Sequence, residues 1–401
     1  MAEIQGNSDH GFDRVADAFA ASFDGAPDMG ASLCVYVKGR PVVDLWGGVA
    51  DERTGRFWDR DTISVVFSCT KGLVSILAAR LVEEGRLDYD APASDYWPEI
   101  AQAGKGALKV RDLLAHRAGL SAPRVSFTTE DILDWKRVVH ALEAQEPLWS
   151  PGTAYQYHTI THGWLVGELV RRVTGKSVGQ YFDELIARPL HASAWIGLPS
   201  AEAARMSHLI VGPTLARDVA AAQATRQGEQ GHWLEQAATL GGALPETLVT
   251  PDAGFNDPRL WAAEIPGAGG ITNARSLARI WSACIHDTDG VRLLKSATVE
   301  QVTKVASSGA PIFEVPPPWS AWGMGFQIDS EARRYMTPKG FGHDGAGGQV
   351  AFANPQTGVG FAFVTNYMQA GGDNRATAII NALSESMATR GVVAGQAPSR
   401  A

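Results

Sequence analysis

The residues that favour β-strands gather near the two ends of the chain, and this distribution constrains the fold more than any other feature. Residues 31–48 contain two β-rich runs around the turn residues 38–41, which indicates a hairpin. Residues 347–368 repeat the pattern around a turn at residues 354–358. Strand pairs so far apart in the chain are expected to meet in one antiparallel sheet assembled from both ends.

Helical patterns at about residues 13–23 and 375–390 lie beside these strand pairs, and residues 87–264 are mostly helical with amphipathic runs. The predicted class is therefore α/β of the α+β kind: a central antiparallel β-sheet flanked by helices, plus an inserted, mostly helical domain. We expect residues 1–86 and 265–401 to form the sheet domain and residues 87–264 to form the insertion.

Two stretches have no clear pattern. Residues 212–255 are rich in Ala, Gly and Gln and predict no particular element. Residues 391–401 have the composition of a frayed tail.

Composition and charge exclude several partners. The net charge of −8 comes without a basic run, so the positive surface that nucleic acid requires is not expected. No stretch approaches the ~20 apolar residues of a membrane span, and the first residues are acidic where a secretory signal is positive. The three cysteines are far apart, as is typical of reduced thiols. We expect a cytoplasmic protein with no membrane partner; the oligomeric state is left open.

Residues 63–85 carry the candidate nucleophile. A short apolar run precedes a helix in which leucines recur every four residues, and Gly85 is expected to end that helix. Ser68 and Lys71 stand at its beginning, and the three-residue spacing places both side chains on one face. Burial lowers the pKa of a lysine, and a neutral amine can take the proton from a serine hydroxyl.

Five blocks of the sequence resemble the serine β-lactamase and DD-peptidase superfamily, and within it the class C β-lactamase-like esterases called family VIII carboxylesterases. In chain order these blocks are residues 68–99, 110–120, 151–177, 262–280 and 341–368. The resemblance implies a β-lactamase/transpeptidase-like fold and a serine hydrolase that uses no cofactor.

The resemblance implies that Tyr157, in the sequence Tyr157-His158-Thr159, is the third catalytic residue. A phenol beside a lysine can deliver a proton to the leaving oxygen. On the sequence alone, Tyr155 is the alternative candidate for the role of Tyr157. Thr159 stands where β-lactamases carry asparagine, which casts doubt on recognition of an amide side chain in the substrate.

The third family motif, Lys-Thr-Gly, is replaced here by His343-Asp344-Gly345. The resemblance implies that Gly345 lets the substrate approach the backbone, and that the amides of Ala346 and Ser68 form an oxyanion hole. A histidine is mostly neutral near pH 7, so His343 is not expected to hold a substrate carboxylate. Asp344 would either repel that carboxylate or raise the pKa of His343, depending on where it points.

Other motifs are interpreted as structural. Residues 175–179 fit Gly-x-Ser-x-Gly, but a helix precedes them, so Gly175 and Ser177 are expected to cap two helices. His158 and His162 are four residues apart but lack the glutamate and third ligand of a zinc site, so no metal is predicted. His116 is expected to organise the helical domain. Tryptophans expected near the site are Trp149, Trp261, Trp319 and Trp322.

The predicted function is hydrolysis of small-molecule carboxylic esters with short acyl chains through an acyl-enzyme on Ser68. One alternative is hydrolysis of β-lactams or small amides at the same site. Another alternative, from a different class, is a catalytically silent scaffold of the same fold.

Overall fold

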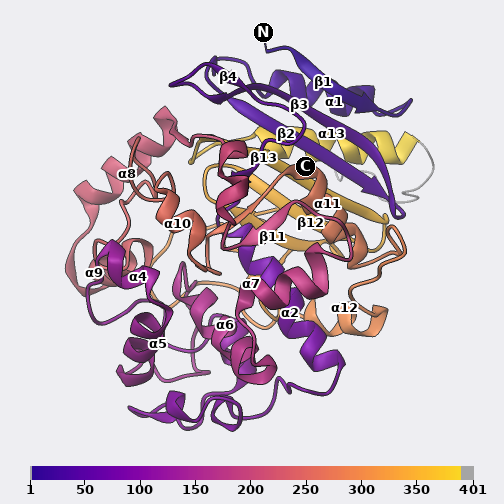
Figure 1. Ribbon diagram of the computed structural model, residues 1–401. Coiled ribbons are helices and arrows are strands. Elements are labelled where there is room, and N and C mark those ends of the chain that lie inside the picture. Colours follow the sequence, from indigo (N-terminus) through magenta and orange to yellow (C-terminus); the bar gives the residue numbers. More distant parts are fainter. Residues whose placement is uncertain (1, 390–401) are drawn as a thin grey trace.

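The antiparallel sheet that the two chain ends predict lies at the centre of the molecule and has nine strands. The computed structural model describes residues 2–389, and Figure 1 shows the sheet with helices on both faces. Along the sheet the strands are β1 (Ile4–Ser8), β3 (Arg40–Asp51), β2 (Gly30–Val37), β13 (Val359–Thr365), β12 (Gln349–Asn354), β11 (Phe341–Gly345), β10 (Gln327–Ile328) and β9 (Ala321–Trp322), with β4 (Arg56–Phe57) paired to β3. The N-terminal and C-terminal strand pairs meet where β2 pairs with β13.

The first hairpin turns more tightly than the sequence predicted. Its loop is the dipeptide Lys38-Gly39, both with positive φ (49° and 80°), and Arg40 already begins β3. Two-residue loops of this kind match the twist of the paired strands. The second turn spans residues 355–358, as expected.

The two faces of the sheet carry separate cores, because successive side chains point to opposite faces. Leu33 and Val35 of β2 pack toward α1 (Asp13–Ala21) and α13 (Arg375–Thr389). Cys34 and Tyr36 pack toward the helices of the other face. The sheet is therefore covered on both sides, as the sequence predicted.

On that second face α11 (Ala274–Ala283) lies very close to the sheet. A Cβ at Gly360 would stand 2.6 Å from the Ser282 amide nitrogen, so only glycine fits there. The larger of the two cores continues from this face through α2 (Cys69–Glu83) into the helical segment without interruption.

Residues 87–264 are mostly helical, as predicted. Their α-helices are α3 (Val110–Leu114), α4 (Thr129–Leu133), α5 (Trp135–Ala144), α6 (Thr161–Thr174), α7 (Val178–Phe182), α8 (Pro213–Thr225), α9 (Gly228–Thr239) and α10 (Pro258–Ala262); α12 (Ser296–Val302) follows α11. The stretch without a predicted element thus holds α8 and α9. The predicted tail, residues 391–401, lies outside the described residues, and the domain boundaries stay a prediction.

Two short strands of this segment pair with strands outside it. β6 (Ala194–Ile196) and β5 (Ser64–Val65) flank β8 (Gly270–Thr272), and β7 (Ile210–Val211) pairs in parallel with β14 (Tyr367–Met368). Strands β6, β7 and β8 were not predicted from the sequence, because two or three residues are too few to show a period of two.

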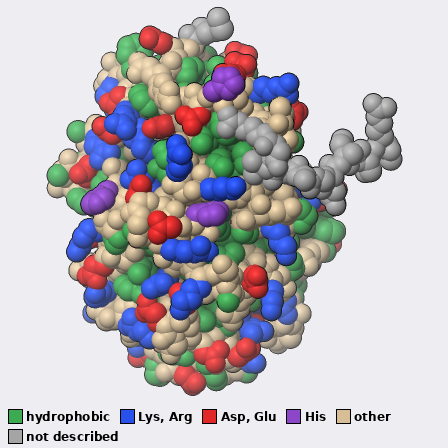
Figure 2. Space-filling view, turned by 90° about the vertical axis from the view of Figure 1, so that its right-hand side faces the viewer, with side chains coloured by type: hydrophobic (Ala, Val, Ile, Leu, Met, Phe, Trp, Pro, Cys, Tyr) green, Lys and Arg blue, Asp and Glu red, His purple; other side chains and the backbone are tan. Residues whose placement is uncertain are grey.

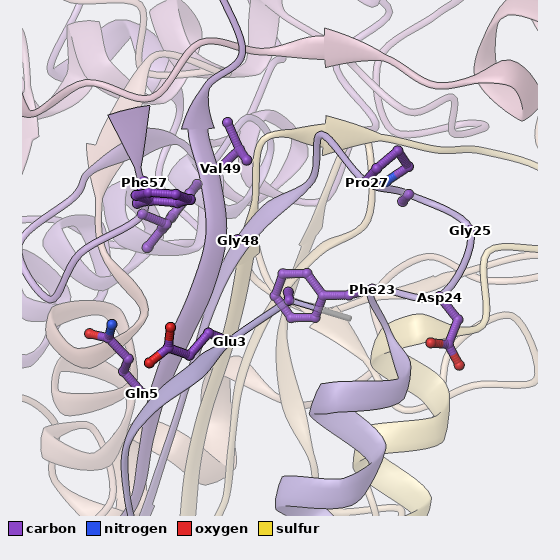
Figure 3. Close-up of a pocket in the computed structure, with 12 residues that line it drawn as sticks. Glu3, Gln5, Phe23, Asp24, Gly25, Pro27, Gly48, Val49 and Phe57 are labelled. Carbon is purple, nitrogen blue, oxygen red and sulfur yellow. The ribbon is translucent and has the colours of Figure 1, made fainter. Parts of the chain in front are cut away.

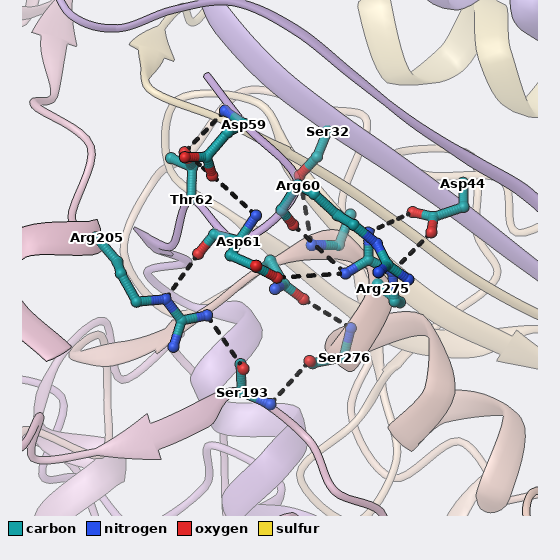
Figure 4. A network of polar contacts seen from close by, with 12 residues as sticks. Ser32, Asp44, Asp59, Arg60, Asp61, Thr62, Ser193, Arg205, Arg275 and Ser276 are labelled. Carbon is teal, nitrogen blue, oxygen red and sulfur yellow. Dashed lines mark hydrogen bonds and ion pairs between the residues drawn. The ribbon is translucent and has the colours of Figure 1, made fainter. Parts of the chain in front are cut away.

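A polar network strengthens the same junction (Figure 4). Arg275 of α11 forms an ion pair with Asp44 of β3 at 2.6 Å. Arg205 donates to the Asp61 carbonyl and to Ser193 Oγ, at 2.9 and 3.1 Å. Arg205 thus connects the helical segment to the loop before β5, and Arg275 connects α11 to the sheet.

Charged side chains of both signs are interspersed on the side shown in Figure 2, and neither sign forms a continuous patch there. No helix among residues 2–389 is long and apolar enough to cross a membrane.

Candidate active site

Ser68 lies at the junction between β5 and α2. It is the N-cap residue of α2, with φ −66° and ψ −10°, and its side chain makes no capping hydrogen bond. The preceding Phe67 has a φ of 44°, an unfavourable conformation for a residue with a Cβ. Such backbone strain is concentrated at functional sites, and here it turns the half-buried Ser68 toward a cavity.

Lys71 is fully buried one turn along the same helix. Its Nζ lies 2.9 Å from Ser68 Oγ, 2.6 Å from the carbonyl oxygen of Thr159 and 2.6 Å from that of Gly267. No carboxylate pairs with Lys71 among the described residues. The spacing of Ser68 and Lys71 therefore gives the contact that the sequence predicted.

These three contacts match the bonding capacity of a neutral amine. Burial lowers the pKa of Lys71 well below its ordinary value. A neutral amine has two N–H donors, which the carbonyls of Thr159 and Gly267 accept, and one lone pair, which is left for the Ser68 hydroxyl proton. An amine held in this way can accept a proton from a serine hydroxyl.

Tyr157 lies close to both Ser68 and Lys71. Lys71 Nζ stands 5.0 Å from the centre of its ring, which is stacked on the Trp322 ring at 4.9 Å. Burial raises the pKa of Tyr157, and a hydrogen bond with Ser68 opposes that rise. The phenol is therefore protonated, as a general acid must be.

Tyr155, the rival tyrosine, is placed differently. Its hydroxyl bonds to the carbonyl oxygen of Gly309, away from the Ser68–Lys71 pair. Thr159 borders the cavity and holds Lys71 through its backbone carbonyl.

His343 is buried on β11, with 2% of its surface exposed. Its Nδ1 lies 2.6 Å from the Asp344 carbonyl oxygen, so Nδ1 carries the proton. Its Nε2 has no hydrogen-bond partner among the described residues. Burial and the nearby Lys71 lower the pKa of His343 to about 3. His343 is thus neutral and supplies no fixed cation.

The Asp344 carboxylate points toward Arg333 and Tyr335 and forms no ion pair with the His343 ring. Its carboxylate accepts from Arg333 Nε at 2.5 Å and from the Tyr335 hydroxyl at 2.9 Å. The charge of Asp344 is therefore balanced by Arg333, and the alternative in which Asp344 turns His343 into a cation is not supported.

Gly345 ends β11 beside the loop that precedes Ser68. A Cβ at this position would stand 2.3 Å from the Val66 carbonyl oxygen, so glycine is needed for the close approach. Ala346 follows directly and borders the same cavity as Ser68. The role of the Ala346 amide in an oxyanion hole stays a prediction.

The histidines of the helical segment support the site. The His158 amide donates to His116 Nδ1, and both ring nitrogens of His158 are engaged with the backbone of Gln156 and Leu120. The His116 ring packs 4.9 Å from the Tyr157 ring. His116 therefore organises the segment that carries Tyr157, and His158 has no free nitrogen for a metal.

The Gly-x-Ser-x-Gly motif is structural, as predicted. Gly175 ends α6 with a φ of 72°, and Ser177 caps α7 by accepting from the Gln180 amide. Elsewhere among the described residues, Asp51, Glu52 and His208 bring their side-chain atoms within 4.8 Å of one another. The sequence analysis did not identify this group, in which Arg53 pairs with Asp51 and the His208 ring bonds to Glu52.

The cavity at Ser68 has a volume of about 430 Å³ and is mostly apolar. Its lining includes Phe67, Tyr155, Ile160, Leu248, Ala268, Pro311, Val315, Pro318, Trp319, Trp322, His343 and Ala346. Asp344 is the one charged residue in the lining. Of the four expected tryptophans, Trp319 and Trp322 border the cavity, Trp149 packs behind it against His158 (5.9 Å), and Trp261 is not in the lining.

A larger cavity of about 640 Å³ lies between β1, β3 and the end of α1 (Figure 3). Among the described residues, its lining contains no serine, lysine or histidine. The nucleophile thus identifies the smaller cavity as the candidate active site.

Comparison with known proteins gives the class of this one. The Beta-lactamase family model matches residues 19–384, and the chain belongs to that family. It is a serine hydrolase with the β-lactamase-like fold. The resemblance and the fold class that the sequence predicted are confirmed.

Individual relatives resemble this chain over most of their length. LipL of Mycobacterium tuberculosis, an esterase/beta-lactamase, is 35% identical over 372 residues, which cover 90% of this chain and 83% of LipL. The crystal structure of a family VIII carboxylesterase superposes with a TM-score of 0.84 at 34% identity, covering 96% of this chain and all of that one. The crystal structure of a penicillin-binding protein homologue from Caulobacter crescentus superposes with a TM-score of 0.83 at 36% identity, covering 96% of this chain and all of that one.

Proposed function

We propose that the protein hydrolyses carboxylic esters with short acyl chains through an acyl-enzyme on Ser68. The observation that carries the proposal is the buried amine of Lys71, held by two carbonyls with its third contact to Ser68 Oγ, beside a mostly apolar cavity. The similarity to the family VIII carboxylesterase supports the choice of esters.

Acylation follows from the positions of three side chains. Ser68 Oγ attacks the ester carbonyl carbon while its proton passes to Lys71 Nζ. The amides of Ser68 and Ala346 stabilise the oxyanion. The bond to the alcohol oxygen then breaks, and the departing oxygen takes the proton of Tyr157, which regains one from Lys71. Water attacks the acyl-enzyme by the reverse transfers, releasing the acid and restoring Ser68.

Penicillins and cephalosporins carry a carboxylate that a fixed cation must bind. The residue that replaces the family lysine is His343, which is neutral, and the Asp344 charge beside it is already paired with Arg333. Esters need no such cation. These contacts favour esters over β-lactams at this site.

The test is a direct comparison of two substrates at neutral pH. The value of kcat/KM for p-nitrophenyl butyrate should exceed that for nitrocefin, and His343→Lys should raise the nitrocefin value by about tenfold or more, since a hydrogen bond to a charged group is worth roughly 1.5–3 kcal/mol. A matched His232→Lys variant, at an exposed histidine of α9, should change kcat/KM for neither substrate. A wild-type preference for nitrocefin would contradict the ester proposal.

The pH dependence should report Lys71. Only the neutral amine accepts the Ser68 proton, so kcat/KM should fall as the pH falls through the pKa of Lys71. Because burial lowers that pKa, the plateau should be reached well below about 10.4, the ordinary value for lysine. The measurement is a pH profile of ethyl butyrate and p-nitrophenyl butyrate hydrolysis.

Tyr157→Phe is the companion variant for this profile. It should keep the acidic limb and lower the plateau more for ethyl butyrate, whose alkoxide needs a proton, than for p-nitrophenyl butyrate, whose phenolate does not. If the acidic limb disappears in Tyr157→Phe, the titrating group is Tyr157 and the role of Lys71 is wrong.

A further inference from the structure

Three exposed apolar side chains form a rim beside the active-site cavity. Ile312, Val315 and Trp319 are 39%, 40% and 36% exposed. They are half of the six large hydrophobic side chains exposed among residues 2–389, and they lie within eight consecutive residues. Isolated exposed apolar residues are common on proteins, whereas a concentration of them beside a cavity indicates a binding surface.

The rim is held firmly against the segment that carries Tyr157. The Ile312 amide donates to the Tyr155 carbonyl oxygen at 2.9 Å, and the Phe313 amide donates to Gln156 Oε1 at 3.2 Å. The Phe313 ring is buried, with its centre 5.9 Å from that of Trp149. The exposed positions of the rim therefore result from a fixed backbone.

The rim continues the lining of the cavity. Val315 and Trp319 border both the cavity and solvent. The polar edge of Trp319 is satisfied, because its Nε1 donates to the Val315 carbonyl oxygen at 2.7 Å. Its indole faces are left for apolar contact. A cavity of about 430 Å³ lies at the small end of ligand sites, so a larger apolar group has to extend over the rim.

The position of Tyr157 decides which half of the ester reaches the rim. Under the proposed function, Tyr157 gives its proton to the alcohol oxygen, so the alcohol group lies on the Tyr157 side of Ser68. The rim is bonded to Tyr155 and Gln156, directly before Tyr157. We infer that the rim binds the alcohol group, and that the substrates are esters of short acids with large apolar alcohols, such as long-chain alkyl or aryl alcohols.

Three esters separate the two halves of the substrate: ethyl acetate, octyl acetate and ethyl octanoate. Trp319→Ala should lower kcat/KM for octyl acetate by about tenfold, mainly through KM, since an apolar contact of this size is worth one to two orders of magnitude. The value for ethyl acetate should fall far less than that for octyl acetate, because its ethyl group is too small to extend over the rim. The inhibition constant of 1-octanol should rise by a similar factor, which provides a readout independent of turnover.

Phe57→Ala is the matched control, because Phe57 is an aromatic residue 76% exposed that borders the other cavity. It should change none of these values. Equal losses on octyl acetate and ethyl acetate in Trp319→Ala, or a loss confined to ethyl octanoate, would overturn the inference. If the wild-type enzyme hydrolyses none of the three esters, or Ser68→Ala hydrolyses them equally well, it is the proposed function that fails.

Discussion

Replacing Ser68 with alanine should abolish ester turnover, with a loss on the order of a millionfold in kcat, as in comparable serine hydrolases. A covalent mechanism has no substitute for its nucleophile. The fold should survive, because the Ser68 side chain makes no capping bond to α2 and its hydroxyl bonds only to Lys71 and Tyr157 among the described residues. The measurements are kcat on p-nitrophenyl butyrate, labelling by a fluorophosphonate probe, and the melting temperature.

Ser177→Ala is the matched control for this experiment. Ser177 occupies the Gly-x-Ser-x-Gly motif, and its hydroxyl caps α7. Its replacement should cost about 1 kcal/mol of stability and leave labelling and turnover intact. A Ser68→Ala variant that still acquires the label would refute the assignment of the nucleophile. A wild-type protein that acquires no label would favour the silent-scaffold alternative.

The parts of this fold that the sequence predicted are those with a repeated local signal. The leucines of α2 recur at four-residue spacing over a long helix, and its end at Gly85 has the expected positive φ of 69°. The strands β12 and β13 are continuous runs of buried residues, and the turn at residues 355–358 lies between them. A long apolar repeat and apolar runs bounded by turn residues can both be recognised in a single sequence.

The parts that were missed depend on tertiary contact. Strands β9 and β10 have two residues each and exist because β11 offers a free edge. Helices α8 and α9 come from an Ala- and Gln-rich stretch, and α8 has no fully buried residue that would create an apolar stripe. A search for helix propensity instead of periodicity would have found them, because alanine and glutamine are strong helix formers.

In the active site, too, the contacts that follow from local spacing were predicted and the long-range contacts were not. The Ser68–Lys71 pair follows from helical spacing, and so sequence alone predicted their contact. The carbonyls of Thr159 and Gly267 that hold Lys71 are backbone groups, so no side-chain type at these positions indicates their role. The pairing of Arg333 with Asp344 joins a loop to β11, and no spacing rule connects the two. Backbone acceptors and long-range ion pairs leave no pattern in a single sequence.

Lys71→Arg should reduce kcat/KM by about 10⁴-fold, the upper range for loss of a general base. The guanidinium keeps its proton at any working pH and cannot accept one from Ser68. It must also fit where an amine is fully buried between two carbonyls, so the melting temperature has to be measured alongside activity. Lys71→Ala separates the two effects: if it folds, exogenous methylamine should restore part of the turnover, because a small neutral amine can take the vacated position and act as the base. An arginine variant with normal turnover on p-nitrophenyl butyrate, or an alanine variant that folds but gains nothing from methylamine, would show that Lys71 supports the site without accepting the proton.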